Sequence, residues 1–242
     1  MTKTILVASG KGGVGKSTVS AFLGQALALR GNRVLLVELD CGLRSLDVAL
    51  GVAKDVALDF GDVARGCEPE KAVMPCSFCS GLSVLCAAGS RISVETETLR
   101  RIFDFASKNF DFLLWDCPAG IGDTLEAAKG FCDLALVIAT PDPSSIRAAQ
   151  RAGTLLRDEK VIGRRLIINR CPENPKKLAP IQNLDEIIDQ TELQLLGVLW
   201  DDPKTRLAFD SGALLENESP NRKNFADIAG RILGERIPLG FK

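Results

Sequence analysis

The hydrophobic positions of this 242-residue chain fall into two alternating patterns. One is a series of short runs rich in Val, Ile and Leu, typical of strands buried on both faces of a parallel sheet. Between these runs, apolar residues recur at helical spacing. The alternation predicts a doubly wound α/β fold, a mostly parallel sheet with helices on both faces, formed by residues 1–242 as a single domain. The strands are expected at 4–8, 33–37, 82–85, 112–115, 134–139, 166–168 and 195–200.

Local signals mark where several helices begin and end. After Lys16, apolar residues form a wide face, and Gly31 is a residue type that ends helices. Ser219 followed by Pro220 has the pattern of an N-cap with proline at the first helical position, which predicts a last helix reaching about residue 233. Further helices are expected at 94–105, 143–156 and 183–189, and a proline-rich loop at 172–180.

Charge and composition narrow the possible chemistry. Lys and Arg number 30 against 31 Asp and Glu, so the net charge of −1 gives no general attraction to nucleic acid or to an acidic membrane. The chain contains no histidine, which excludes catalytic arrangements and metal sites that depend on it. It also lacks tyrosine, so any base-stacking surface must use its 11 Phe and 2 Trp. Acid–base chemistry must therefore come from Asp, Glu, Lys, Cys, bound water or a metal.

The cysteine content and the apolar runs predict a compartment. Eight cysteines in this length are too few for a disulfide scaffold. We find no secretory signal before them and no apolar run long enough to cross a bilayer. We therefore expect a cytoplasmic protein with reduced thiols.

Residues 10–17, GKGGVGKS, match the phosphate-loop pattern G-x-x-x-x-G-K-[ST] at every fixed position. They lie between a predicted strand and a predicted helix, which is the context that the motif requires. Glycines let successive backbone N–H groups face a phosphate, and the start of the helix adds partial positive charge. Lys16 can then bridge the β- and γ-phosphates, and the Ser17 hydroxyl can reach Mg²⁺. This predicts an ATP or ADP site formed by Gly10, Lys11, Gly12, Gly13, Val14, Gly15, Lys16, Ser17 and Thr18.

Carboxylates follow the predicted strands that neighbour this loop. Asp40 comes shortly after the strand at 33–37, and Asp116 directly follows the one at 112–115. The carboxyl end of a parallel strand beside a phosphate loop is well placed to hold hydrated Mg²⁺. The predicted magnesium set is Ser17, Glu38, Asp40 and Asp116.

The string KGGVGKST from Lys11 to Thr18 resembles the phosphate loop of the MinD/ParA family of ATPases. In that family the early lysine reaches the partner's phosphates across a dimer interface. The resemblance continues over nearly the whole chain: residues 38–47 are similar to a first switch of pattern D-x-D-x-G-L-R-N-L-D, with Glu38 in place of Asp and Ser45 in place of Asn. Residues 116–120, DCPAG, are similar to a second switch D-S-P-A-G, and residues 141–147 to a dimer-forming segment.

The resemblance implies roles for particular residues. Lys11, Lys16 and Asp40 would be catalytic, with Asp40 orienting the attacking water, and the Gly120 N–H would approach the γ-phosphate. The base pocket would consist of Asn169, Arg170, Trp200 and Asp201, although Asn169 also fits a simple cap. The resemblance further implies an ATP-dependent homodimer whose slow hydrolysis of ATP is accelerated by a protein activator.

The chain departs from MinD-type members of this family at its C-terminus. Those members usually end in a short amphipathic helix that enters the membrane. Here Gly234, Pro238 and Gly240 all oppose helix formation, so membrane binding through this end is not expected. Either the protein does not bind membrane, or a partner holds it peripherally there.

A second departure is the C-x-x-C formed by Cys76 and Cys79. Two chains of a dimer could supply four thiolates to a bridging Zn²⁺ or an iron–sulfur cluster. The alternative is that these are ordinary reduced thiols in a loop before a strand.

The sequence thus predicts a MinD-type Mg²⁺-ATPase that acts as a switch in division-site placement or spatial organisation. Three alternatives stay open. One is a metal-cofactor maturation ATPase that uses Cys76 and Cys79, and another is a nucleotide-binding module without turnover. The third is a ParA-type partition ATPase that binds DNA, for which the chain offers few basic residues, namely Arg164, Arg165, Lys176, Lys177, Arg222 and Lys223.

Overall fold

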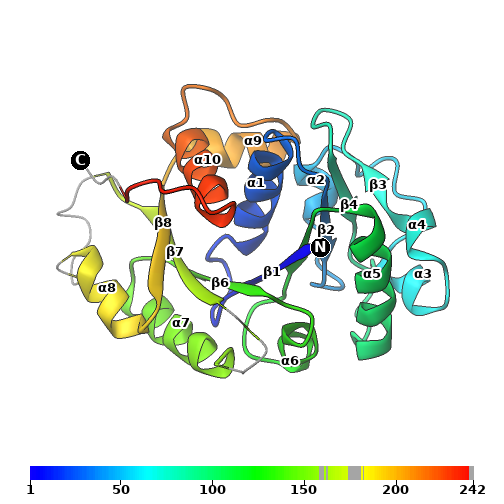
Figure 1. Cartoon of the computed structure of the whole chain (residues 1–242), viewed down its shortest axis with the longest axis horizontal. Coiled ribbons are helices and arrows are strands. Elements are labelled where there is room, and N and C mark those ends of the chain that lie inside the picture. Colours follow the sequence, from blue (N-terminus) through cyan, green and yellow to red (C-terminus); the bar gives the residue numbers. More distant parts are fainter. Residues whose placement is uncertain (158–160, 162, 174–180, 182, 240–242) are drawn as a thin grey trace.

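The computed structural model describes residues 1–157, 161, 163–173, 181 and 183–239, and these form one eight-stranded sheet (Figure 1). The strand order is β3-β4-β2-β5-β1-β6-β7-β8, and every neighbouring pair is parallel except β3 with β4. The strands are β1 (Lys3–Ala8), β2 (Val34–Glu38), β3 (Met74–Pro75), β4 (Leu82–Leu85), β5 (Phe112–Asp116), β6 (Leu134–Ala139), β7 (Gly163–Cys171) and β8 (Gln194–Trp200).

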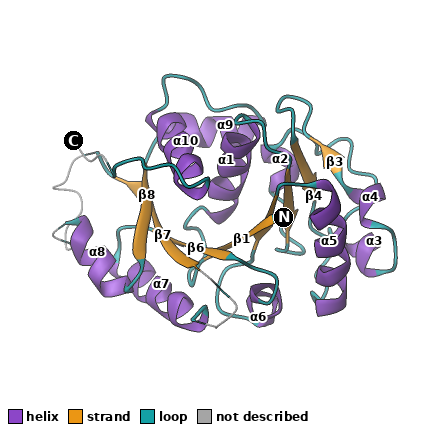
Figure 2. Cartoon of the chain, viewed as in Figure 1, coloured by secondary structure: helices purple, strands orange, loops and turns teal. Residues whose placement is uncertain are grey.

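Helices cover both faces of the sheet (Figure 2). On one face lie α1, α2, α9 and α10, and on the other lie α5, α6, α7 and α8, with α3 and α4 beside α5. The doubly wound α/β architecture that the sequence predicts is confirmed. The helices are α1 (Lys16–Ala28), α2 (Leu46–Ala49), α3 (Phe60–Ala64), α4 (Pro69–Ala72), α5 (Thr96–Asn109), α6 (Asp123–Lys129), α7 (Pro143–Leu155), α8 (Leu184–Thr191), α9 (Pro203–Ser211) and α10 (Pro220–Ile232).

The central strand β1 shows why an apolar run becomes a buried parallel strand. Successive side chains point to opposite faces. Leu6 and Ala8 pack in the cluster with α5 to α8, whereas Ile5 and Val7 pack in the cluster with α1 and α10. All four are fully buried, so both faces of the strand must be hydrophobic.

Most predicted boundaries agree with the structure to within a few residues, and the last helix agrees closely. Ser219 is the N-cap of α10, and its side chain accepts a hydrogen bond from the Asn221 N–H. The main differences are that β7 extends well beyond 166–168, and that the short elements β3, α2, α3, α4, α6 and α9 were not predicted. Most of the loop expected at 172–180 lies outside the described residues.

The chain after α10 is held against the edge strand β8 by one arginine. Arg231 donates hydrogen bonds to the carbonyl oxygens of Leu196, Ile237 and Pro238 at 2.8, 3.0 and 2.7 Å. Residues 235–239 form no helix. Within the described ranges, no helix combines the length and apolar character needed to cross a membrane.

Candidate nucleotide site

The phosphate loop joins the carboxyl end of β1 to the start of α1, at the centre of the sheet. Gly15 is the N-cap of α1 with φ of 92°, a left-handed conformation that favours glycine. A Cβ at Gly15 would lie 2.3 Å from Asn169 Nδ2, and one at Gly10 would lie 2.2 Å from the Ala148 carbonyl oxygen. Close packing therefore favours glycine at both positions, and at Gly15 the left-handed backbone favours it as well.

Lys16 is the first residue of α1 and is only 8% exposed. Its charge is close enough to Asp116 to lower the pKa of that carboxyl. We find no ion pair between Lys16 and any other described side chain. The ammonium group is thus available to a phosphate, as the motif predicts.

Asp116 ends β5 and is 1% exposed. Its Oδ1 accepts a hydrogen bond from Ser20 Oγ at 2.8 Å, whereas its buried Oδ2 has no hydrogen-bond partner in the described part of the chain. Burial raises the pKa of Asp116 to about 7, although the nearby Ser17 and Ser20 hydroxyls and Lys16 lower it. A buried carboxylate oxygen without a partner beside Ser17 fits a hydrated magnesium ion, which is bound by few carboxylates and keeps several waters.

Glu38 ends β2, where the sequence places it, but its carboxylate is bonded within the chain and does not face an open metal site. It is fully buried at the end of β2, and its Oε1 accepts hydrogen bonds from Ser45 N, Ser45 Oγ and Leu46 N at 2.7, 2.9 and 3.2 Å. Its Oε2 accepts one from Ala87 N at 3.2 Å. The four hydrogen bonds lower the pKa of Glu38, but burial outweighs them and raises it above its usual value.

Oε1 therefore fixes the first switch and Oε2 ties it to the chain just after β4, so both oxygens are occupied by the chain and the geometry does not support Glu38 as a magnesium ligand. Among the described residues, the predicted carboxylates do not gather into a group of three or more that could hold a metal. Asp40 is half-buried on the loop after β2, and no described group pairs with its carboxylate. That leaves Asp40 free to accept a hydrogen bond from water.

Lys11 lies at the exposed edge of the loop and pairs within its own chain. Its Nζ is 3.0 Å from Asp142 Oδ1 and 2.7 Å from Ser144 Oγ, at the start of α7. Burial raises the pKa of Asp142, but hydrogen bonds from Ser144, Thr140 and Lys11 outweigh it and hold this pKa well below its usual range. A role for Lys11 in a partner's site would require it to leave this contact.

The second switch contacts the phosphate loop through Gly120. Its N–H donates to the Ser9 carbonyl oxygen at 2.9 Å, and its φ is 97°. The contact of this N–H with a γ-phosphate, which the resemblance implies, would therefore replace an existing hydrogen bond. Such an exchange is the kind of change that a switch loop undergoes.

A pocket of about 260 Å³ brings together the residues expected to bind a base. Asn169 is 6% exposed, and its Nδ2 donates to the Val14 carbonyl oxygen at 2.7 Å, so it also fixes the phosphate loop. Asn221 holds the opposite wall by accepting from Trp200 N at 2.7 Å and donating to Trp200 O at 3.0 Å. The pocket is lined by Thr18, Asn169, Arg170, Trp200, Asp201, Asp202, Thr205, Arg206, Phe209 and Asp210.

Sequence reasoning missed the part of this pocket that α9 contributes. The signal was present, because Asp202 caps α9 and Pro203 follows at its first position. Thr205, Arg206, Phe209 and Asp210 could have been placed on one helix from that signal.

Cys76 and Cys79 lie in the loop before β4, as the sequence predicts, but among the described residues they form no metal-binding group. Cys76 and Cys79 are 5% and 1% exposed, and both pack in the hydrophobic cluster with α1 and α2. Burial raises the pKa of Cys79 to about 11, whereas metal binding requires thiolate. Thiols enclosed in this way could not bridge a metal between two chains, so the Zn²⁺ or iron–sulfur expectation is not supported.

The basic residues considered for DNA are mostly engaged within the chain. Arg164 donates to the Gly153 carbonyl oxygen, and Arg222 to that of Leu215, while Lys223 pairs with Asp227. Lys176 and Lys177 lie outside the described residues. Arg164 lies near the start of β7 whereas Arg222 lies near the start of α10, so these residues do not share one element.

The site has three parts: a phosphate loop at the end of β1, the buried Asp116 at the end of the neighbouring strand β5, and a pocket beside them. Together they define a P-loop nucleotide-binding protein. The family model described as "ParA: NUBPL iron-transfer P-loop NTPase" matches residues 1–233. The chain belongs to the ParA/MinD family of P-loop NTPases, whose members are ATPases.

Relatives agree in sequence and in structure. The septum site-determining protein MinD of Bacillus subtilis is 37% identical over 99% of this chain and 92% of its own length. MinD in the Aquifex aeolicus MinC:MinD cell division complex has a TM-score of 0.90 at 32% identity, covering 99% of this chain and 98% of that one. Pyrococcus horikoshii MinD, solved with Mg-ADP, has a TM-score of 0.81 at 25% identity, covering 98% and 100%. The chain is therefore a MinD-like member of the family.

Proposed function

We propose that this protein binds Mg-ATP, dimerises around it and hydrolyses it to ADP and phosphate, acting as a switch in division-site placement or a similar spatial task. The observation that carries the proposal is that the buried Lys16, which has no ion pair with another described side chain, lies near the buried Asp116 at the end of β5, whose Oδ2 has no hydrogen-bond partner among the described residues. One group suits a phosphate and the other suits its metal. The Mg-ADP bound to the Pyrococcus horikoshii relative supports the same assignment.

Each residue then has a physical task. The loop amides and Lys16 hold the phosphates and stabilise the charge that grows on them during transfer. Ser17 and Asp116 hold the magnesium ion, which when bound neutralises phosphate charge. Asp40 accepts a hydrogen bond from water and orients it, and Asn169 contacts the base while fixing the loop through Val14.

Dimerisation would use Lys11. In the single chain it is held by Asp142, the N-cap of α7, and by Ser144 in the first turn of that helix. Exchange of this exposed ion pair for a partner's phosphates costs little, because exposed pairs contribute about 0–1 kcal/mol. A protein activator that favours the released lysine would accelerate hydrolysis, and the Aquifex aeolicus relative was solved in complex with MinC.

The test is Lys16→Ala, compared with Lys108→Ala, which removes an exposed lysine on α5 away from the site. Light scattering after size exclusion should show that ATP with Mg²⁺ converts the parent chain and the Lys108 variant to dimers, and that the Lys16 variant stays monomeric. Phosphate should likewise be released from ATP by the parent chain and the Lys108 variant but not by the Lys16 variant. ATP-dependent dimers of the Lys16 variant would overturn the proposal.

A further inference from the structure

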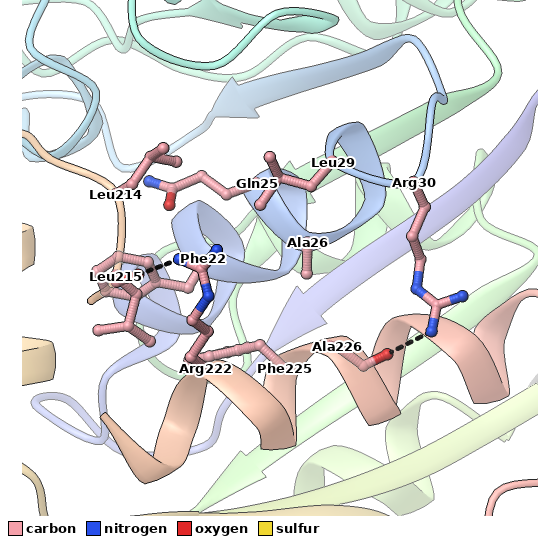
Figure 3. Close-up of a pocket in the computed structure, with 10 residues that line it drawn as sticks. All are labelled: Phe22, Gln25, Ala26, Leu29, Arg30, Leu214, Leu215, Arg222, Phe225 and Ala226. Atoms are coloured by element: carbon pink, nitrogen blue, oxygen red, sulfur yellow. Dashed lines mark hydrogen bonds between the residues drawn. The ribbon is translucent and has the colours of Figure 1, made fainter. Parts of the chain in front are cut away.

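A pocket of about 220 Å³ lies between α1 and α10, and none of its residues belongs to the nucleotide site (Figure 3). Its walls are mainly apolar side chains from the two helices and from the segment that connects α9 to α10. A 150 Å³ apolar cavity is enough for benzene, so this one suits a small organic body. It is lined by Phe22, Gln25, Ala26, Leu29, Arg30, Leu214, Leu215, Arg222, Phe225 and Ala226.

One lining residue has an unmet hydrogen-bonding need. Gln25 is 3% exposed, and its Nε2 has no hydrogen-bond partner among the residues that the structure describes. Its side chain extends from α1 toward Leu214 (Figure 3). Leaving a buried amide donor unpaired is costly, so an acceptor brought by a ligand would be stabilised there.

A second lining residue supplies charge. Arg222 donates one hydrogen bond to the Leu215 carbonyl oxygen, and we find no ion pair between it and another described side chain. Arg30, on the other side of the pocket, is already paired with Glu235 and also donates to the Ala226 carbonyl oxygen. The uncompensated positive charge of the pocket is therefore at Arg222.

We propose that this pocket binds a small amphipathic carboxylate, an aliphatic or aryl acid whose apolar body lies between α1 and α10. A carboxylate suits these two donors, because its oxygens accept hydrogen bonds from an amide such as that of Gln25 and its charge matches the Arg222 guanidinium. The apolar walls contribute the rest of the affinity through burial of the body.

The ligand would act on the base pocket through the first turn of α10. Asn221, which holds Trp200, is the neighbour of Arg222 in the chain, and its Nδ2 also donates to Thr205 Oγ1 at 2.9 Å. Fixing Arg222 fixes this turn and thereby the wall that Trp200 forms. This effector role rests on the proposed nucleotide site, whereas the binding site itself does not.

The probe is octanoate, with octanol as the uncharged control, titrated into the full chain and followed by amide NMR shifts. We expect saturable binding of one octanoate, shifts centred on α1 and α10, and at least tenfold weaker binding of octanol. Arg222→Gln and Gln25→Leu should weaken octanoate binding fivefold or more, whereas Lys223→Gln, one residue away and exposed, should not change it. Ala226→Phe should fill the pocket and abolish binding, with a thermal melt to show that it folds. Shifts elsewhere, or equal binding by the filled variant, would overturn the site.

The effector role has its own measurement. Saturating octanoate should tighten ADP binding at least threefold in the parent chain, and should leave it unchanged in Ala226→Phe because that variant cannot bind octanoate. Coupling between two sites is reciprocal, so ADP should tighten octanoate binding by the same factor. An unchanged ADP affinity with octanoate bound would overturn the effector role alone. Absence of ADP binding under all conditions would instead count against the proposed function.

Discussion

The buried Glu38 carboxylate is the feature of this site most open to a quantitative test. Glu38→Asp keeps the charge but withdraws the carboxylate by one methylene, about 1.5 Å of bond length. The four hydrogen bonds to Ser45, Leu46 and Ala87 now measure 2.7 to 3.2 Å between donor and acceptor. A shift of that size takes them beyond hydrogen-bonding distance unless the backbone follows.

The expected loss of stability follows from those contacts. Hydrogen bonds to a charged group contribute about 1.5–3 kcal/mol each, and a buried carboxylate without partners is costly. Local relaxation should restore some of the four hydrogen bonds. We therefore expect the free energy of unfolding to fall by about 3–5 kcal/mol. Glu70→Asp, the same change at an exposed position on α4, should alter it by less than about 0.5 kcal/mol.

The second arm of the test uses the family pattern, in which Asp and Asn stand where this chain has Glu38 and Ser45. Ser45→Asn lengthens the partner by about as much as Glu38→Asp shortens the acid. The double variant should therefore be more stable than the two single losses predict, with a coupling energy of at least about 1.5 kcal/mol in a double-mutant cycle. Urea unfolding curves provide the free energies. If the losses add to within about 0.5 kcal/mol, or Glu38→Asp is as stable as the parent, Glu38 does not organise the switch as described.

Three further outcomes are expected. The raised pKa of Asp116 means that its ionisation opposes folding, so the metal-free chain should lose up to about 4 kcal/mol of stability as pH rises from 4 to 7. Asp116→Asn should remove most of this slope in unfolding curves recorded from pH 4 to 8, and an unchanged slope would contradict it. Asn169→Ala should weaken ADP binding at least tenfold by calorimetry, because one amide fixes the loop and lines the base pocket; a change below twofold would argue against both roles. A thiol reagent should label the half-buried Cys41 and Cys67 much faster than the buried cysteines, counted by mass spectrometry; rapid labelling of Cys79 would show that the cluster around it opens.

Sequence patterns predicted the elements whose capping residues or buried hydrophobic residues are visible within the element itself. The last helix was placed closely because Ser219 and Pro220 carry its cap in adjacent residues. Strand β7 was predicted too short, since its ends carry Arg164, Arg165 and Arg170, which a hydrophobic pattern cannot recognise as strand. Strand β3 has two residues, one of them Pro75, and exists only through its antiparallel contact with β4. A pairing of this kind between two segments leaves no repeating pattern of hydrophobic residues in the sequence of either one.

The same division holds within the site. The phosphate loop could be predicted because its function requires fixed residues at fixed spacing. The role of the Glu38 carboxylate could not, because it has two possible partners, a metal or N–H groups of the chain, and the folded path of the chain decides between them. Cys76 and Cys79 lie in the loop before β4 as expected, but the sequence could not show that packing in the cluster with α1 and α2 encloses their thiols.

The sheet order has a consequence for how the chain becomes competent during its synthesis. The central strand is made first, yet its neighbours β5 and β6 are contributed by residues beyond 111, and the base pocket needs residues up to 210. A ribosome-bound fragment therefore carries a complete phosphate motif long before it has a place for the base. If the proposed site is correct, nucleotide cannot assist the folding of the first half, and its stabilising effect begins only when almost the whole chain has been released.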